Sequence, residues 1–187
     1  MTTDYKLISK DELTELAKSY ELNSWNELTN FVKELPYGRN KNRNDLKLVL
    51  TEKKGSCSSK HALLKAIADL NNVPNIKLIL GIYKMTQINT PKIGNVLTET
   101  YLEFIPEAHC YLKVGEQRLD LTDKSSDIKK IETDIIQEIE IEPKQIAKFK
   151  VDYHKTFIKN WIIENNIVLN FNQIWSIRET CIENLSK

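Results

Sequence analysis

Three residues have the chemistry of a thiol nucleophile and its base: Cys57, His109 and Asp120. Cys57 lies two residues after Gly55, where a polar run gives way to an Ala- and Leu-rich helical pattern. At the first turn of a helix, backbone N–H groups without intrahelical acceptors and the helix dipole favour a thiolate. A thiol beside an imidazole that is held by a carboxylate is an activated nucleophile. The backbone N–H of Cys57 could also point at a developing oxyanion.

The pairing of His109 with Asp120 follows from a predicted β-hairpin. Residues 108–114 and 117–121 form its strands, and Gly115 at the first central position of the turn favours type II′. This register makes His109 and Asp120 diagonal cross-strand neighbours with Cα atoms about 7–8 Å apart. The expected opposite pairs are Val114 with Gln117, Leu112 with Leu119, Tyr111 with Asp120, and His109 with Thr122.

The other elements are predicted from hydrophobic periodicity and caps. A central helix beginning near Gly55 is apolar over most of its circumference and leaves a narrow stripe of His61, Lys65 and Asp69. The remaining predicted helices are 9–20 with a Ser9–Glu12 capping box, 24–35 ended by Pro36, 45–50, 151–165 and 172–184. The predicted strands outside the hairpin are 76–83, 99–105 and a segment of 132–142 with one solvated face, and residues 37–45 and 84–98 are predicted loops.

The charged side chains nearly balance, with 27 Lys and Arg against 26 Asp and Glu and a formal net charge of +1. This balance argues against the excess of positive charge that nucleic-acid binding requires. Most of the basic residues are lysine, whereas base and phosphate recognition favours arginine. No apolar run approaches the length of about 20 residues that a membrane span needs. Residues 1–20 lack the apolar stretch of a signal peptide. We therefore expect a cytoplasmic protein with reduced cysteines, no nucleic-acid partner and no membrane partner.

Several motifs occur together in residues 28–123: Gly55-Ser56-Cys57 before a helix, Asn72-Val73-Pro74-Asn75 before a strand, Ala108-His109-Cys110-Tyr111, and Asp120-Leu121-Thr122. This combination resembles the transglutaminase-like superfamily with its papain-type fold. The resemblance implies that Cys57 is the nucleophile, His109 the base and Asp120 its orienting carboxylate. Residues 31–37 are similar to the helix and tyrosine upstream of the family's nucleophile. The candidate substrate-binding residues are Tyr37, Ser56 and Tyr111.

Each of these assignments has a plainer alternative. Cys57 could be a small buried residue at a helix start, and His109 and Asp120 could be a structural hydrogen-bonded pair. Cys57 and His61 have the spacing of zinc ligands on one helix, with His109 as a third ligand. The other expectations are structural: Cys110 and Cys181 in the core, His154 on the surface, and Trp161 and Trp175 in packing.

The sequence thus predicts an α+β protein with a transglutaminase-like core in residues 1–127 and a helical C-terminal extension in 128–187 packed on the same domain. The predicted function is hydrolysis of a peptide or protein amide, or transfer of its acyl group to an amine, through a thioester at Cys57, without metal or organic cofactor. The alternative is a catalytically silent relative that binds a peptide or protein partner.

Overall fold

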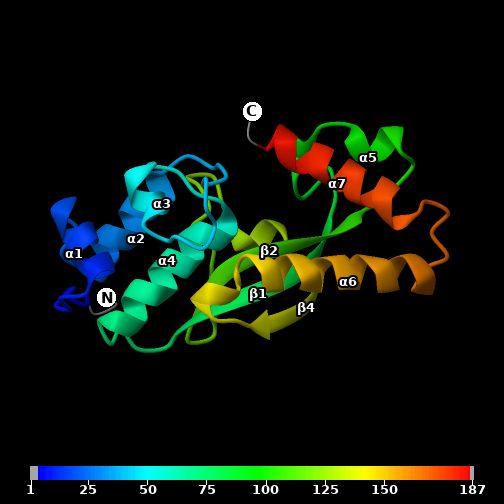
Figure 1. Cartoon of the computed structure of the whole chain (residues 1–187). Helices are drawn as coiled ribbons and strands as arrows, with labels where there is room; N and C mark the ends of the chain where they lie inside the picture. The colour runs from blue at the N-terminus through cyan, green and yellow to red at the C-terminus, as the bar shows by residue number, and fades with distance from the viewer. Residues whose placement is uncertain (1–3, 186–187) are drawn as a thin grey trace. The chain divides into compact units, whose positions relative to one another are not determined.

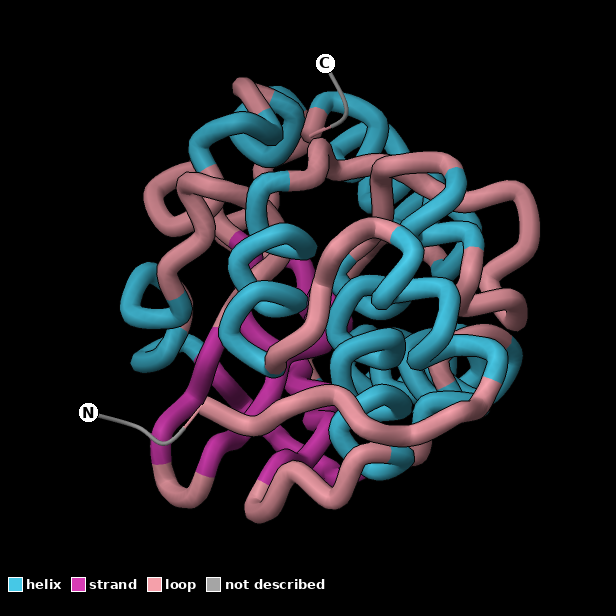
Figure 2. The backbone as a smooth tube through the Cα atoms, turned by 90° about the vertical axis from the view of Figure 1, so that its left-hand side faces the viewer, coloured by secondary structure: helices cyan, strands magenta, loops and turns pink. Residues whose placement is uncertain are grey.

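The computed structural model describes residues 4–185, and residues 1–3 and 186–187 lie outside this range. The described chain combines helices with a four-stranded antiparallel sheet, so the predicted α+β class is confirmed (Figure 1). The strand order is β3-β2-β1-β4, and Figure 2 shows the strands in magenta, side by side. Their bounds are β1 Ile76–Met85, β2 Ile105–Val114, β3 Gln117–Leu119 and β4 Ile135–Glu140.

The chain divides into two compact units. Unit 1 contains the described residues up to Ile79 together with Cys110–Asp127 and Glu140–Ala147. Unit 2 contains Leu80–His109, Ile128–Ile139 and the described residues from Lys148 onward. The boundary therefore falls inside β1, inside β2 and before the last residue of β4. Among the described helices, none is long and apolar enough to cross a membrane.

Unit 1 is built around α4, which contacts α1, α2, α3 and the short helix η4. Leu63, Leu64 and Ile67, on successive turns of α4, are completely buried, as the apolar pattern predicts. The expected polar stripe is wrong at its first position, because His61 is also fully buried. The bounds are α1 Glu12–Ser19, α2 Trp25–Glu34, α3 Leu48–Thr51, α4 Cys57–Leu70 and η4 Pro143–Gln145.

Helix starts in unit 1 follow local capping chemistry. Ser24 caps α2 in a reciprocal box with Glu27, and the helix stops at Leu35 before Pro36, as predicted. The expected Ser9–Glu12 box is wrong. Asp11 caps α1 instead, because its Oδ1 accepts from the N–H groups of both Leu13 and Thr14 at 2.9 Å.

In unit 2, α7 contacts α5, α6 and the short helix η1. The predicted strand at 99–105 is wrong over most of its length, since α5 occupies Val96–Glu99 and Tyr101 has a left-handed φ of 57°. The amide of Thr100 bonds back to the carbonyl of Leu97 at 3.2 Å, which ends the helix in a turn. The bounds are η1 Pro91–Ile93, α5 Val96–Glu99, η2 Ile128–Lys130, η3 Glu132–Asp134, α6 Lys148–Glu164 and α7 Phe171–Asn184.

The hairpin has the predicted register. Leu112 pairs with Leu119 and Val114 with Gln117 across antiparallel strands. Gly115 has a φ of 59°, the positive value that a type II′ turn requires at its first central position. β3 ends at Leu119, two residues earlier than predicted, so Asp120 follows the strand rather than belonging to it.

Candidate functional site

Cys57 is the first residue of α4, as its motif predicts. Ser56 is the N-cap, and its Oγ and the backbone N–H of Ser59 form one half of a capping box at 3.4 Å. The other half is a 2.9 Å bond from the Ser56 N–H to the Ser59 Oγ. Cys57 is 8% exposed, so the structure holds it at the helix start with little contact with solvent. The dipole of a 14-residue helix favours a negative charge at this position.

Tyr37 and Ser56 are brought together by a short stretch of backbone pairing. Tyr37 forms an isolated parallel bridge with Gly55, the residue before Ser56. The N–H of Gly38 donates to the Gly55 carbonyl at 3.1 Å, and the Gly55 N–H donates to the Pro36 carbonyl at 3.2 Å. Two of the three candidate substrate-binding residues therefore lie beside the start of α4.

Gly55 is required by a close approach rather than by an unusual backbone angle. A Cβ at this position would lie 2.7 Å from the Cγ of Lys60 and 3.0 Å from the Oγ of Ser59. The Lys60 stem fills the space that a side chain at position 55 would need. The glycine of the Gly-Ser-Cys motif thus allows the Lys60 side chain to pack against the backbone that precedes Cys57.

Both ring nitrogens of His61 form hydrogen bonds with backbone groups. Its Nδ1 lies 2.7 Å from the carbonyl of Cys57, and its Nε2 accepts from the N–H of Leu121 at 2.8 Å. A carbonyl can only accept and an amide N–H can only donate, so the network assigns the proton to Nδ1. His61 is therefore a neutral imidazole that joins Cys57 to the segment after β3.

Lys60 makes a second connection to the same segment. Its ammonium is fully buried and donates to the carbonyls of Leu35 at 2.5 Å and Thr122 at 2.6 Å. Burial lowers the pKa of Lys60 to about 8, against the opposing charges of Asp123 and Asp120. Lys60 was not among the predicted site residues. The signal that could have identified it is a lysine at the edge of a largely apolar helical pattern.

Asp120 lies in a tight turn directly after β3. Its Oδ1 accepts from the N–H of Thr122 at 3.0 Å and from the Thr122 hydroxyl at 2.6 Å. The same oxygen lies 3.8 Å from the Nε2 of His61, and the Asp120 side chain is 8% exposed. Unit 1 thus holds the nucleophile candidate and the carboxylate candidate on two segments that Lys60 and His61 bind to each other.

His109 and Tyr111 lie on β2. Tyr111 is fully buried in unit 1. His109 belongs to unit 2, is half-buried, and contacts Tyr83 edge-on with ring centroids 6.2 Å apart. The pairing of His109 with Asp120 stays a prediction.

The zinc alternative is weakened by the bonds of His61. Coordination would require His61 to give up either the Cys57 carbonyl or the Leu121 amide. Within residues 4–185, no group of three or more His, Cys, Asp or Glu side chains is arranged to hold a metal. Cys110 and Cys181 are core residues, as predicted, and burial raises the pKa of Cys181 to about 11.

Unit 2 contains a buried charged cluster of Arg178, Glu107 and His154 that the sequence did not predict. Arg178 binds Glu107 through two nitrogens, at 2.7 Å and 2.5 Å. His154, which was expected on the surface, is 2% exposed because its Nε2 donates to the carbonyl of Pro106 at 2.7 Å. Burial alone would raise the pKa of Glu107, but the charges of Arg178 and His154 hold it at about 2. Packing of α6 and α7 against β2 creates this cluster, and the spacing of these residues gives no local signal of it.

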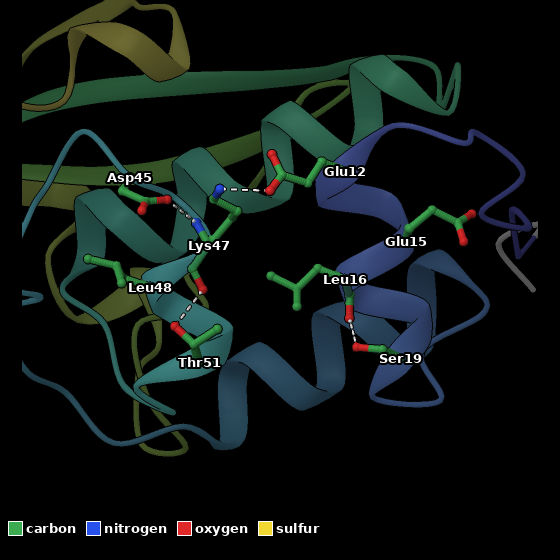
Figure 3. Close-up of a pocket in the computed structure, with 8 residues that line it drawn as sticks. All are labelled: Glu12, Glu15, Leu16, Ser19, Asp45, Lys47, Leu48 and Thr51. Carbon is green, nitrogen blue, oxygen red and sulfur yellow. Dashed lines mark hydrogen bonds and ion pairs between the residues drawn. The ribbon is translucent and has the colours of Figure 1, made fainter.

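Unit 1 also carries an open hollow of about 530 Å³ between α1 and the segment 45–51 (Figure 3). Lys47 bridges it with an ion pair to Glu12 at 2.9 Å. None of the predicted site residues lines this hollow. Its other lining residues are Glu15, Leu16, Ser19, Asp45, Leu48 and Thr51.

Comparisons of this chain with descriptions of protein families, with curated proteins and with solved structures find no match.

Proposed function

We propose that this protein catalyses thiol-dependent acyl chemistry on an amide, on a core that resembles the transglutaminase-like, papain-type fold. The observation that carries the proposal is the bridge made by His61 inside unit 1. One imidazole contacts the carbonyl of Cys57 and the N–H of Leu121, the residue after Asp120. A thiol at a helix start and a carboxylate are thereby held on one framework, as nucleophilic catalysis requires.

In the proposed reaction, the sulfur of Cys57 attacks the carbonyl carbon of the amide. His109 takes the thiol proton and returns it to the leaving amine, while Asp120 orients the imidazole and stabilises its charged form. A thioester forms between Cys57 and the acyl group as the C–N bond breaks. Water or a second amine then releases the acyl group and restores the thiol.

Two features of unit 1 support the nucleophile assignment. The start of α4 favours a negative charge on Cys57. The N–H of Cys57 is proposed to bind the developing oxyanion. Tyr37 and Ser56 flank the same position and are proposed to contact the substrate. Hydrolysis or deamidation is the favoured outcome, with transfer to an amine as the other fate of the thioester.

The test is turnover of an amide-rich peptide pool by wild type and by Cys57→Ala. Wild type is expected to release ammonia or new amines, and to form hydroxamates when hydroxylamine intercepts the thioester. Cys57→Ala is expected to lose both products and to keep its peptide affinity, because a thiol adds little to a binding surface.

Cys181→Ala is the matched control, since it removes a buried thiol that has no proposed role. It should retain turnover. Peptide binding by a fully reduced wild type without any turnover would refute catalysis and favour a silent binding module.

A further inference from the structure

We propose that Lys60 and His61 are positioning residues that set the reactivity of Cys57 by fixing the Asp120 turn against the start of α4. We call these two side chains and their four backbone partners the α4 clamp. The partners are the carbonyls of Leu35, Cys57 and Thr122 and the N–H of Leu121. This inference rests on the proposed function, which supplies the reaction that the clamp serves.

The His61 half of the clamp acts on the residues next to the chemistry. The Cys57 carbonyl belongs to the nucleophile candidate itself, and the Leu121 N–H is one peptide unit from Asp120. All of these groups are buried or half-buried, so a lost bond would not be fully replaced by water. A change at His61 must therefore shift or loosen both segments. Because its proton is on Nδ1 and its Nε2 already accepts, His61 acts through position and not as a base.

The Lys60 half of the clamp binds Thr122, two residues after Asp120. Thr122 gives its carbonyl to Lys60 while its N–H and hydroxyl hold the Oδ1 of Asp120. The orientation of the Asp120 carboxylate is thus linked through Thr122 to the buried ammonium. Leu35, at the end of α2, is the other acceptor, so α2 and the Asp120 turn are both bound to α4.

Two amide substitutions separate the halves of the His61 bridge. The amide of Asn occupies the place of Nδ1 and that of Gln the place of Nε2. His61→Gln can still accept from Leu121, whereas His61→Asn cannot reach it. Both variants keep a polar amide at the same buried site, which makes them a matched pair. Lys60→Met removes the second connection, and Lys65→Met, at an ion pair with Asp69 on the same helix, is the control.

The experiment measures Cys57 alkylation by iodoacetamide as a function of pH, peptide turnover, and amide exchange at Leu121. For His61→Asn we expect about tenfold faster exchange at Leu121. We also expect about tenfold slower alkylation at about pH 6, which corresponds to a rise of about one unit in the Cys57 pKa. Lys60→Met should slow alkylation and turnover in the same direction. Lys65→Met should stay within about threefold of wild type in all three measurements. His61→Gln should do so for amide exchange at Leu121, because it keeps the acceptor for that N–H.

The pH profile distinguishes positioning from a purely structural role. If His61→Asn or Lys60→Met is folded but keeps the wild-type alkylation profile and turnover, the inference is wrong for that residue. If one of these variants fails to fold, the other variant is compared with Lys65→Met, and its alkylation profile and turnover decide whether the clamp sets Cys57 reactivity. A wild-type protein without turnover and with an ordinary Cys57 profile would refute the proposed function itself. The clamp inference alone would be refuted if wild type is active and the folded clamp variants react as wild type does.

Discussion

Replacing Lys60 with Met should change how the stability of the protein depends on pH. The Lys60 side chain is fully buried, and its nitrogen donates to the carbonyls of Leu35 and Thr122. A neutral amine still has two hydrogens, so both bonds survive deprotonation. Burial lowers the pKa in the folded protein from 10.5 to about 8, although Asp123 and Asp120 oppose the shift. The folded state therefore releases this proton more readily than the unfolded chain does.

The sign of the effect follows from this difference in proton binding. Between pH 8 and 10.5 the unfolded chain binds more protons than the folded chain, so stability from this group rises with pH. The difference of 2.5 units between 10.5 and 8 corresponds to at most about 3 kcal/mol. Titration is incomplete between about pH 7 and about pH 10, and solvent screening lowers the effect further. We expect a gain of about 2 kcal/mol in this window for wild type relative to Lys60→Met.

The assay is urea unfolding of both proteins at several pH values across this window. The difference between the two unfolding free energies cancels the titration of the other groups. Lys65→Met serves as the control for removing an ammonium from the same helix, because Lys65 forms an ion pair with Asp69, whose side chain is 50% exposed. A flat difference between Lys60→Met and wild type would refute the reasoning that burial controls the Lys60 ammonium.

Three further predictions test the site and the second unit. Asp120→Asn should leave the melting temperature unchanged and reduce Cys57 alkylation at about pH 6; unfolding with intact reactivity per folded molecule would make this carboxylate structural. Gly55→Ala should cost about 1–3 kcal/mol in urea unfolding, because its Cβ would lie 2.7 Å from the Lys60 stem; an unchanged midpoint contradicts the clash. The folded pKa of Glu107 is about 2 against an ordinary 4.5, so its stabilisation is present above 4.5 and falls by about 3 kcal/mol as pH drops towards 2. Glu107→Gln should lack this loss in acid-unfolding curves, and identical curves would argue against a paired carboxylate.

Much of the local structure was predictable because its signals lie within a few residues of each other. Ser24 and Glu27 have the spacing of a capping box and form one at the start of α2, and Pro36 follows the end of that helix. The hairpin register follows from a turn with glycine at its first central position and from the alternation of side chains, and the structure confirms it. The position of Cys57 at the start of α4 was predictable for the same reason, since Ser56 caps the helix.

Other features depend on contacts between segments that are distant in the sequence. His61 belongs to the predicted polar stripe of α4, and Lys60 ends the polar run before the apolar residues. The Leu121 amide and the Thr122 carbonyl nevertheless bind these two side chains in the interior. Likewise, the sequence around His154 is typical of a helix surface, but in the structure this histidine is buried and donates to the carbonyl of Pro106.

The physical reason for this division is the cost of burying polar groups. A capping box or a turn satisfies its backbone donors with neighbours in the chain, so the residues that make it are visible in the sequence. A buried lysine or histidine is stable only when backbone groups from other segments bind it. Leu121 is 60 residues from His61 in the sequence, and Thr122 is 62 residues from Lys60. The sequence by itself determined the capped helices and the hairpin register, and the tertiary structure decided which polar side chains are buried beside Cys57 and Asp120.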